Sequence, residues 1–285
     1  MPHRRLVQAA VFVLSLLPLA ANAGKHHTLK ATPDSVAWGW LDPKQPPQLT
    51  IESGDTVSIE TLMHAKDGIQ KGVSMEKITI PIRPFPGTLA LGIDPEDPSP
   101  RKGEPKLEPG AVRPPRTPEQ KLAPVSSLRP WKNGSNMDIN ELVEGSTLYL
   151  PVFQEGGLIW TGDSHCAQGN GEVNLTAMEC SFEEIELQPI VRKDLKLTWP
   201  RIETKTHYIQ VGFDEDLNKA FTAALRETID FLVTEKKLDR YDAYGLAAVA
   251  ADCRVSQVVD VRKGVHCMVP KSLWAEKKAA KASKN

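Results

Sequence analysis

This chain has no excess of basic residues. Its 35 lysine and arginine residues nearly balance its 36 aspartate and glutamate residues, which gives a formal net charge of -1. Proteins that bind nucleic acid usually gather basic side chains in a patch or stripe. The composition therefore offers no electrostatic basis for nucleic-acid binding and favours a small molecule as the partner.

Cysteine is scarce, and two common metal motifs are missing. The four cysteines show no spacing typical of a thiolate zinc site, and the His-Glu-x-x-His motif of zinc peptidases does not occur. A peptide-active metalloenzyme is therefore the least favoured class. The sequence after the first 20 residues also lacks any apolar run long enough to be predicted to span a membrane.

The composition suits a folded core, which begins after a leader. The 285 residues, 40% of them hydrophobic and 25% charged, are enough for one large or two small domains. Residues 1–23 are predicted to be a secretory signal peptide, because basic Arg4 and Arg5 precede an apolar stretch and Ala21 to Ala23 fit the small-x-small cleavage pattern. An uncleaved anchor is the weaker alternative, since the stretch is shorter than the roughly 20 residues of a spanning helix. We expect a secreted or periplasmic protein with no membrane segment after cleavage.

An oxidising compartment makes the cysteines worth a second inspection. Cys253 and Cys267 flank two predicted strands at a spacing that a hairpin could close, so a disulfide and a pair of buried thiols are both open interpretations. Cys166, beside His165, is a minor candidate for a catalytic nucleophile, because thiol reactivity depends on surroundings that the sequence does not reveal.

Hydrophobic periodicity divides the rest of the chain into four portions. Residues 24–93 are predicted to be an N-terminal β portion, because apolar residues alternate over 55–62 and 77–83. Residues 94–130 form a charged, proline-rich segment without aromatic residues, which predicts an extended, mobile, solvated insertion; a partner-binding arm is the less favoured alternative. Residues 131–274 are predicted to be a site-bearing β portion with C-terminal α/β elements, and lysine-rich 275–285 a basic tail.

The 131–274 portion shows a change of period. Strands are predicted over 146–152, 157–160, 185–197 and 207–211. An i, i+3, i+4 stripe then predicts an amphipathic helix over 217–233, with acidic residues at its N-terminal end. A shorter helix over 239–251 and a strand pair at 255–260 and 264–269 follow.

The segment from Trp160 to Glu172 concentrates the candidate site residues. It follows an apolar strand and is predicted to be a loop, because three glycines in it permit turns. Asp163, His165 and Glu172 offer two carboxylates and an imidazole within ten residues, which suits metal binding or acid–base chemistry. The alternative is an ordinary turn with a structural histidine.

Several motifs in a consistent order resemble those of the acetamidase/formamidase family. They are Ser135-Asn-Met-Asp-Ile139, Ser146-Thr-Leu-Tyr-Leu-Pro-Val152, Gly162-Asp-Ser-His-Cys-Ala-Gln-Gly-Asn-Gly-Glu-Val173 and Val259-Asp-Val-Arg-Lys-Gly-Val-His-Cys-Met-Val-Pro270. The resemblance runs from His26 to Trp274. It implies a mainly β fold, a jelly-roll-like β-sandwich with an α/β C-terminal portion, and hydrolysis of a small linear amide such as formamide or acetamide to a carboxylate and ammonia.

Amide hydrolysis needs an activated nucleophile and a group that stabilises the developing oxyanion. A divalent metal supplies both, and zinc is the first expectation. Asp163 and His165 are the candidate ligands, His64 would complete the set, and Glu172 is the candidate base. Asp163, His165 and Glu172 are thus the predicted catalytic residues.

The chain departs from the family pattern between Ala65 and Gly72. Family members usually carry a long segment there that includes a Gly-Pro-x-Tyr/Phe-Val stretch and Gly-Ala-Glu-Pro-Gly-Asp, whereas only a few residues bridge the gap here. Part of the usual N-terminal half is therefore expected to be absent, and the open β-edges would allow self-association into a homo-oligomer. The alternative function is a secreted, non-catalytic or altered family member that binds a small amide-like ligand or a metal.

Overall fold

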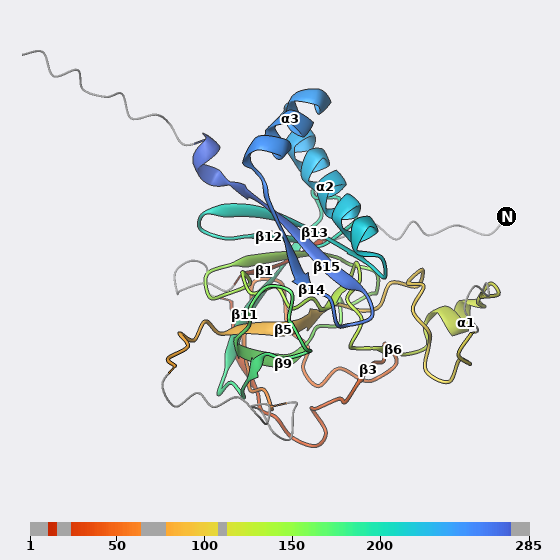
Figure 1. Ribbon diagram of the computed structural model, residues 1–285. Helices are drawn as coiled ribbons and strands as arrows, with labels where there is room; N and C mark the ends of the chain where they lie inside the picture. Colours follow the sequence, from red (N-terminus) through yellow and green to blue (C-terminus); the bar gives the residue numbers. More distant parts are fainter. Residues whose placement is uncertain (1–10, 16–23, 64–77, 108–112, 275–285) are drawn as a thin grey trace, which may run out of the picture.

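Two β-sheets face each other across the main hydrophobic core (Figure 1). The computed structural model describes residues 24–63, 78–107 and 113–274, and the backbone alone of residues 11–15. Strand order in the larger sheet is β14 (Asp252–Gln257), β15 (Lys263–Pro270), β13 (His207–Asp214), β12 (Arg201–Glu203), β8 (Thr147–Pro151), β1 (Val11–Ser15), β11 (Ile185–Arg192), β4 (Thr56–Ile59) and β2 (His26–Leu29). The smaller sheet has the order β10 (Met178–Glu179), β9 (Trp160–Ala167), β5 (Phe85–Ala90) and β7 (Gly134–Asn136), while β3 (Trp40–Leu41) pairs with β6 (Val125–Ser126).

Alternating apolar residues explain how the sheets pack. In β8, Leu148 and Leu150 are buried and Tyr149 between them is half-buried, and Leu187 of β11 and Leu89 of β5 join the same core. Burying each such leucine contributes roughly 1.5 to 3 kcal/mol. The predicted mainly β sandwich is therefore confirmed, with strands of both the 24–93 and 131–274 portions in each sheet.

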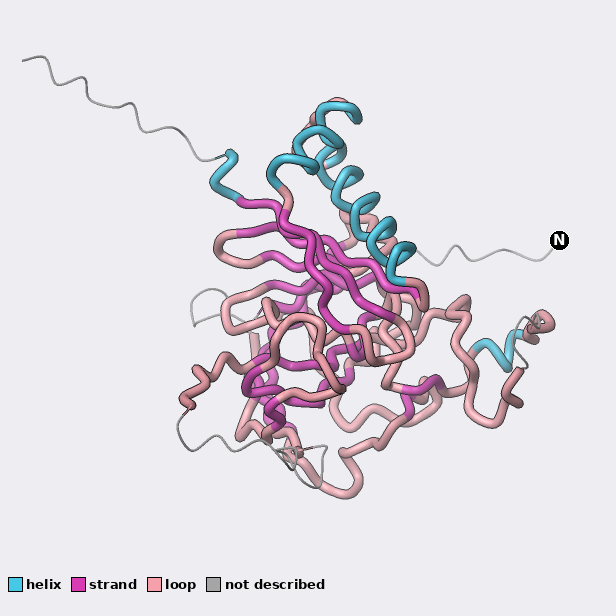
Figure 2. The backbone as a smooth tube through the Cα atoms, viewed as in Figure 1, coloured by secondary structure: helices cyan, strands magenta, loops and turns pink. Residues whose placement is uncertain are grey.

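The two long helices lie together at one end of the molecule, on β13 and β15 (Figures 1 and 2). Helix α2 (Leu217–Thr234) begins after Asp216, whose carboxylate accepts hydrogen bonds from two backbone N–H groups of the first turn. Helix α3 (Arg240–Ala250) begins after Asp239, whose carboxylate accepts one such bond, from the Tyr241 N–H. Gly212 of β13 allows close packing, because a Cβ there would lie 2.4 Å from the Ala220 carbonyl oxygen of α2. Both predicted helices are confirmed.

Three secondary-structure predictions were wrong. Of the strand predicted over 157–160, residues 157–159 form no strand. Residues 78–83 form no strand, and Ile78, Ile80 and Ile82 are exposed, since Pro81 and Pro84 remove backbone donors that a ladder needs. The strand begins at Phe85 instead, and all six residues of β5 are buried, so its burial does not alternate. The predicted loop over 160–172 is a strand as far as residue 167, because pairing with β5 and β10 outweighs the local glycine content.

The proline-rich segment packs against the rest of the fold. It contains α1 (Pro118–Lys121) and β6, and Asp97 and Arg101 are both buried. The Asp97 carboxylate lies 2.9 Å from the guanidinium of buried Arg262, and the Glu104 carboxylate pairs with Arg116 at 2.8 Å. This packing differs from the solvated excursion that the proline content predicts, because ion pairs, together with buried Val125, hold the segment against the fold.

Residues near the N-terminus contribute a strand to the larger sheet. β1, which lies within the predicted signal peptide, pairs antiparallel with both β8 and β11. Cleavage after residue 23 would therefore leave two strand edges facing each other without a partner. The predicted deletion and His64 fall within 64–77 and the basic tail within 275–285, outside the described residues, so these remain predictions. Within the described ranges, no helix has the length and apolar character needed to cross a membrane.

Candidate active site

Strand β9 carries two of the predicted site residues side by side. Asp163 and His165 are two positions apart on the strand, and the Asp163 Oδ1 to His165 Nε2 distance is 3.2 Å. His165 is buried and pairs across the sheet with Phe85, whose ring meets the imidazole edge to face at 5.1 Å. Gly87 of β5 leaves the room for this arrangement, because a Cβ there would lie 2.9 Å from His165 Cε1.

Asp138 is a further acidic residue at the site, which the sequence prediction missed. It follows β7 and is fully buried, with Asn136 Nδ2 donating to its Oδ2 at 2.8 Å. Its Oδ1 lies 3.9 Å from His165 Nδ1. Asp138 belongs to the Ser135 to Ile139 motif, so the signal that could have identified it was present in the sequence.

Glu172 and Asp260 approach from loops that support each other. The backbone N–H of Gly171 donates to the Ser256 carbonyl at 2.9 Å, which holds the loop of buried Glu172 against the end of β14. Asp260 lies in the turn between β14 and β15, where the Gln257 side chain accepts a hydrogen bond from its backbone N–H at 3.1 Å. Asp260 was also missed, although it lies in the Val259 to Pro270 motif.

The carboxylates of this site repel one another. Burial and the charge of Glu172 raise the pKa of Asp138 well above its usual range. Burial and the charge of Asp260 raise the pKa of Glu172 to about 8, and burial raises the pKa of Asp260. Among the described residues, the groups that chiefly set these three pKa values include no lysine or arginine. Among these groups, His165 is the cation that partly offsets the acids, since its charge lowers the pKa of Glu172 and Asp260.

A hydrogen-bond chain determines which nitrogen of His165 carries a proton. Gln168 Nε2 donates to the Asp138 carbonyl at 3.1 Å, which turns Gln168 Oε1 toward His165 Nδ1 at 2.8 Å. Since Oε1 can only accept, we assign the proton to Nδ1. Nε2 then faces Asp163 either as an N–H donor or with a lone pair. Burial lowers the pKa of His165, but the hydrogen bond and charge of Asp163 outweigh it and raise the pKa.

The residues fit a divalent cation. Asp138, His165 and Glu172 each offer a ligand atom within 4.8 Å of the others, and Asp163, His165 and Glu179 form a second such set. Asp138 Oδ1 and Glu172 Oε2 are buried without a hydrogen-bond partner in the described part of the chain. A buried carboxylate oxygen without a partner is costly, and a bound cation would relieve that cost. Imidazole with carboxylates is a donor set that suits zinc.

The four cysteines form two disulfides, so none of them is a free thiol. The Cys253 to Cys267 bond that the strand spacing suggested is present. Cys166 is bonded to Cys180, a pairing that the sequence did not suggest. A cysteine in a disulfide has no thiolate, so the interpretation of Cys166 as a nucleophile was wrong.

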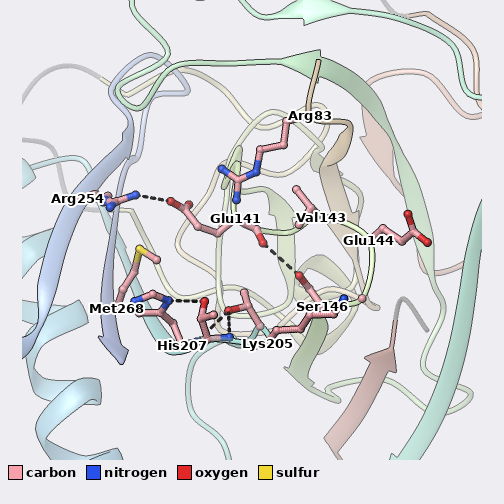
Figure 3. Close-up of a pocket in the computed structure, with 12 residues that line it drawn as sticks. Arg83, Glu141, Val143, Glu144, Ser146, Lys205, His207, Arg254 and Met268 are labelled. Carbon is pink, nitrogen blue, oxygen red and sulfur yellow. Dashed lines mark hydrogen bonds and ion pairs between the residues drawn. The ribbon is translucent and has the colours of Figure 1, made fainter. Parts of the chain in front are cut away.

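Of two pockets in the described part of the chain, one is lined by a residue of the site and the other is not. A pocket of about 330 Å³ is lined by Arg83, Glu141, Arg254 and His207 among others (Figure 3). There the Arg254 guanidinium holds the Glu141 carboxylate at 2.9 Å, and none of the residues around His165 lines this pocket. A second pocket, of about 200 Å³, is lined in part by Asp163. Its position makes it the candidate substrate pocket.

Comparisons with known proteins identify similar sequences. A model described as "Acetamidase/Formamidase family" matches residues 119–275. An acetamidase from Mycolicibacterium smegmatis is 47% identical over 48 residues, which cover 17% of this chain and 12% of that protein. A formamidase from Methylophilus methylotrophus is 43% identical over 47 residues, which cover 16% of this chain and 12% of that protein. The matched stretches are thus a small part of each curated relative.

Solved structures show the same fold over most of the chain. A protein described as a predicted acetamidase/formamidase, from Thermoanaerobacter tengcongensis, aligns with a TM-score of 0.71 and 18% identity, covering 88% of this chain and 97% of that one. An acetamidase from Yersinia enterocolitica aligns with a TM-score of 0.67 and 23% identity, covering 89% of this chain and 94% of that one. The similarity extends beyond residues 119–275 in the fold, although not in close sequence identity.

Proposed function

Because the chain belongs to the acetamidase/formamidase family, we propose that it hydrolyses the C–N bond of a small linear amide. Water adds its oxygen to the carbonyl carbon, the C–N bond breaks, and the products are a carboxylate and ammonia. The observation that carries the proposal is the buried group of Asp138, His165 and Glu172, which has ligand atoms facing one another and two carboxylate oxygens without a partner.

We propose that Asp163 and His165 Nε2 hold a divalent metal beside the buried carboxyl of Asp138, with zinc as the first expectation. When bound, such an ion polarises the amide carbonyl and lowers the pKa of the attacking water. Gln168 positions the imidazole by accepting from Nδ1, so that Nε2 and Asp163 face the same point. Buried Asn136 orients Asp138 in the same way.

Glu172 is the residue that we assign to proton transfer. Its pKa of about 8 means that protonated and deprotonated forms are both populated near neutral pH. A carboxylate of this kind can accept the proton of the attacking water and return it to the leaving nitrogen. The turn at Gly171, held by β14, keeps the Glu172 carboxyl beside Asp138 and His165.

Ammonia release from formamide, acetamide and longer amides tests the proposal. We expect His165→Ala to lose both bound metal and turnover, because it removes a ligand shared by both ligand sets. His207→Ala is the matched control, since His207 lies on β13 in the other pocket. Unchanged metal content and turnover in His165→Ala would show that His165 does not belong to the site. Metal bound without turnover of any amide would instead favour a non-catalytic binding protein.

Export is a separate proposal. The basic, apolar and small-residue order of residues 1–23 supports a cleaved leader, and two disulfides in one chain are typical of an oxidising compartment. N-terminal sequencing of the protein recovered from the periplasm or medium tests this. Sequence starting near residue 24 is the expected result, and an intact leader carrying β1 would contradict it.

A further inference from the structure

The pocket beside Asp163 is built by segments that are far apart in sequence. Its walls come from residues 29–31 and 35–41, from the end of β4 and from the start of β9, and Thr88 of β5 also lines it. Asp163 belongs to this lining and lies 3.2 Å from His165 Nε2. An amide held at His165 would therefore direct one of its substituents into this pocket.

The pocket is larger than formamide or acetamide needs. About 10 to 15 Å³ of such volume holds one water molecule, and acetamide has only four non-hydrogen atoms. The pocket offers about 200 Å³. A substrate of that size would leave most of the pocket to water, whereas a larger acyl group would fill it.

The lining favours an aromatic or bulky apolar group. Trp38, Trp40 and Trp160 contribute three indole rings, and Trp160 is held in place by packing against the apolar cluster of Leu41, Ala90, Ile93 and Val125. Trp38 is 60% exposed and belongs to the same lining. Aromatic rings prefer offset or edge-to-face partners of their own kind.

The charged residues around the pocket do not suit an anionic substituent. Glu60 accepts a hydrogen bond from the Ala31 backbone N–H at 3.1 Å, so its carboxylate is engaged within the wall. Among the described residues that line the pocket, Lys30 is the one basic residue, and Asp163 belongs to the site itself. An anionic acyl group would approach a site that already holds several carboxylates and would be repelled.

We propose that the substrates are primary amides whose carbonyl carbon carries an aromatic or bulky apolar group, seated among Trp38, Trp40 and Trp160. This inference rests on the proposed amide hydrolysis. Since that reaction releases ammonia, the nitrogen carries no substituent, and the bulky group belongs on the carbonyl side.

Phenylacetamide and acetamide, tested on the purified full chain, provide the experiment. We expect kcat/KM for phenylacetamide to exceed that for acetamide by about tenfold or more, which is the range that added apolar contacts supply. Trp38→Ala should reduce this ratio by about fivefold or more, and Trp38→Phe should restore most of it. Tyr241→Ala is the matched control, because Tyr241 is an exposed aromatic residue on α3 and should leave the ratio unchanged.

A direct binding measurement separates this inference from the proposed function. If no amide is hydrolysed, the proposed function fails, and calorimetry with phenylacetamide then decides the inference alone. Saturable binding that Trp38→Ala weakens, with acetamide binding more weakly than phenylacetamide, supports it. Equal kcat/KM values for the two amides, or equal binding where turnover is absent, would overturn it, as would a ratio unaffected by Trp38→Ala.

Discussion

Carboxylates in two regions of this protein have opposite electrostatic surroundings. Around His165, the buried acids Asp138, Glu172 and Asp260 face one another, and burial first and then neighbouring charge raises the pKa of the first two. In the proline-rich segment, the hydrogen bond from Arg116 lowers the pKa of Glu104 to about 2. Buried Asp97 in the same segment is paired with buried Arg262.

This difference indicates that the two regions have different roles. The acids around His165 form a site, and the paired acids of the proline-rich segment stabilise the fold. Acids paired with arginine stabilise the folded chain, whereas a group of unbalanced acids costs free energy and is retained where a ligand uses it. The two regions are also connected. Arg262, which Asp97 holds, lies two residues from Asp260, so the paired region fixes the turn that carries one acid of the unbalanced region.

The largest effect is expected for Asp138→Asn, which removes one charge without changing the shape. Amide turnover should fall by about 10³-fold, within the usual range for loss of an acid–base or ligand group, which corresponds to about 4 kcal/mol in activation free energy. The free energy of unfolding of the metal-free protein should stay level or rise, because the variant no longer buries an ionisable carboxyl beside Glu172. Ammonia release and urea denaturation measure the two effects. A clearly destabilised variant with normal turnover would show that Asp138 stabilises the fold and does not serve the site.

Arg262→Met should give the next largest effect. It leaves the buried Asp97 carboxylate without its partner, which typically costs about 3 to 5 kcal/mol of unfolding free energy. Arg240→Met is the matched control, because the Arg240–Asp230 pair is exposed and should contribute less than about 1 kcal/mol. Urea denaturation measures both variants. Similar losses in the two would mean that burial does not distinguish these ion pairs.

Gly87→Ala tests the crowding at the site. The added Cβ would lie 2.5 Å from Asp138 Oδ1 and 2.9 Å from the Asp163 carbonyl oxygen, so strand β5 or the site must shift. We expect a loss of about 1 to 3 kcal/mol in stability and a fall in turnover of about 10²-fold from misplaced groups. Gly245→Ala in α3 meets no atom within 4 Å and should not destabilise the protein. Full activity of Gly87→Ala would show that the site tolerates displacement.

The smallest effect is expected for Glu104→Gln, and it should depend on pH. Because the folded-state pKa of Glu104 lies near 2 and the ordinary value is 4.5, its stabilisation is present above pH 4.5 and is lost as the pH falls toward 2. At pH 7 we expect the variant to lose about 1 kcal/mol, a value reduced by partial exposure of the pair. Urea denaturation from pH 7 to pH 2 should show the two proteins converging. A constant difference over this range would assign the effect to something other than the charge.

Local sequence was sufficient to predict elements whose structure depends mainly on their own residues. The stripe over 217–233 and acidic Asp216 predicted α2 almost to its ends, and alternation predicted β8 and β13. The prediction of secondary structure failed where pairing with neighbouring strands determines it. Ile78 to Ile82 alternate like a strand yet form none, while glycine-containing residues 160–167 form β9 because β5 and β10 lie on either side.

The same limit applies to the candidate site. Asp163, His165 and Glu172 were identified from one short segment, and the structure brings Asp163 and Glu172 to His165. Asp138 and Asp260 lie about 30 to 90 residues away, so their proximity depends on the pairing of β5 with β7 and on the turn between β14 and β15. Gln168 was inside the recognised motif, but its role depends on a hydrogen bond to the Asp138 carbonyl.

Local patterns were sufficient for the two long helices, most of the strands, the family resemblance and three side chains of the site, because periodicity and short motifs depend on neighbouring residues. The grouping of five acids around one histidine, the Cys166–Cys180 disulfide and the tryptophan-lined pocket at Asp163 required the folded protein. Charge, burial and pocket shape depend on contacts between distant segments, and these contacts form only when the two sheets pack together.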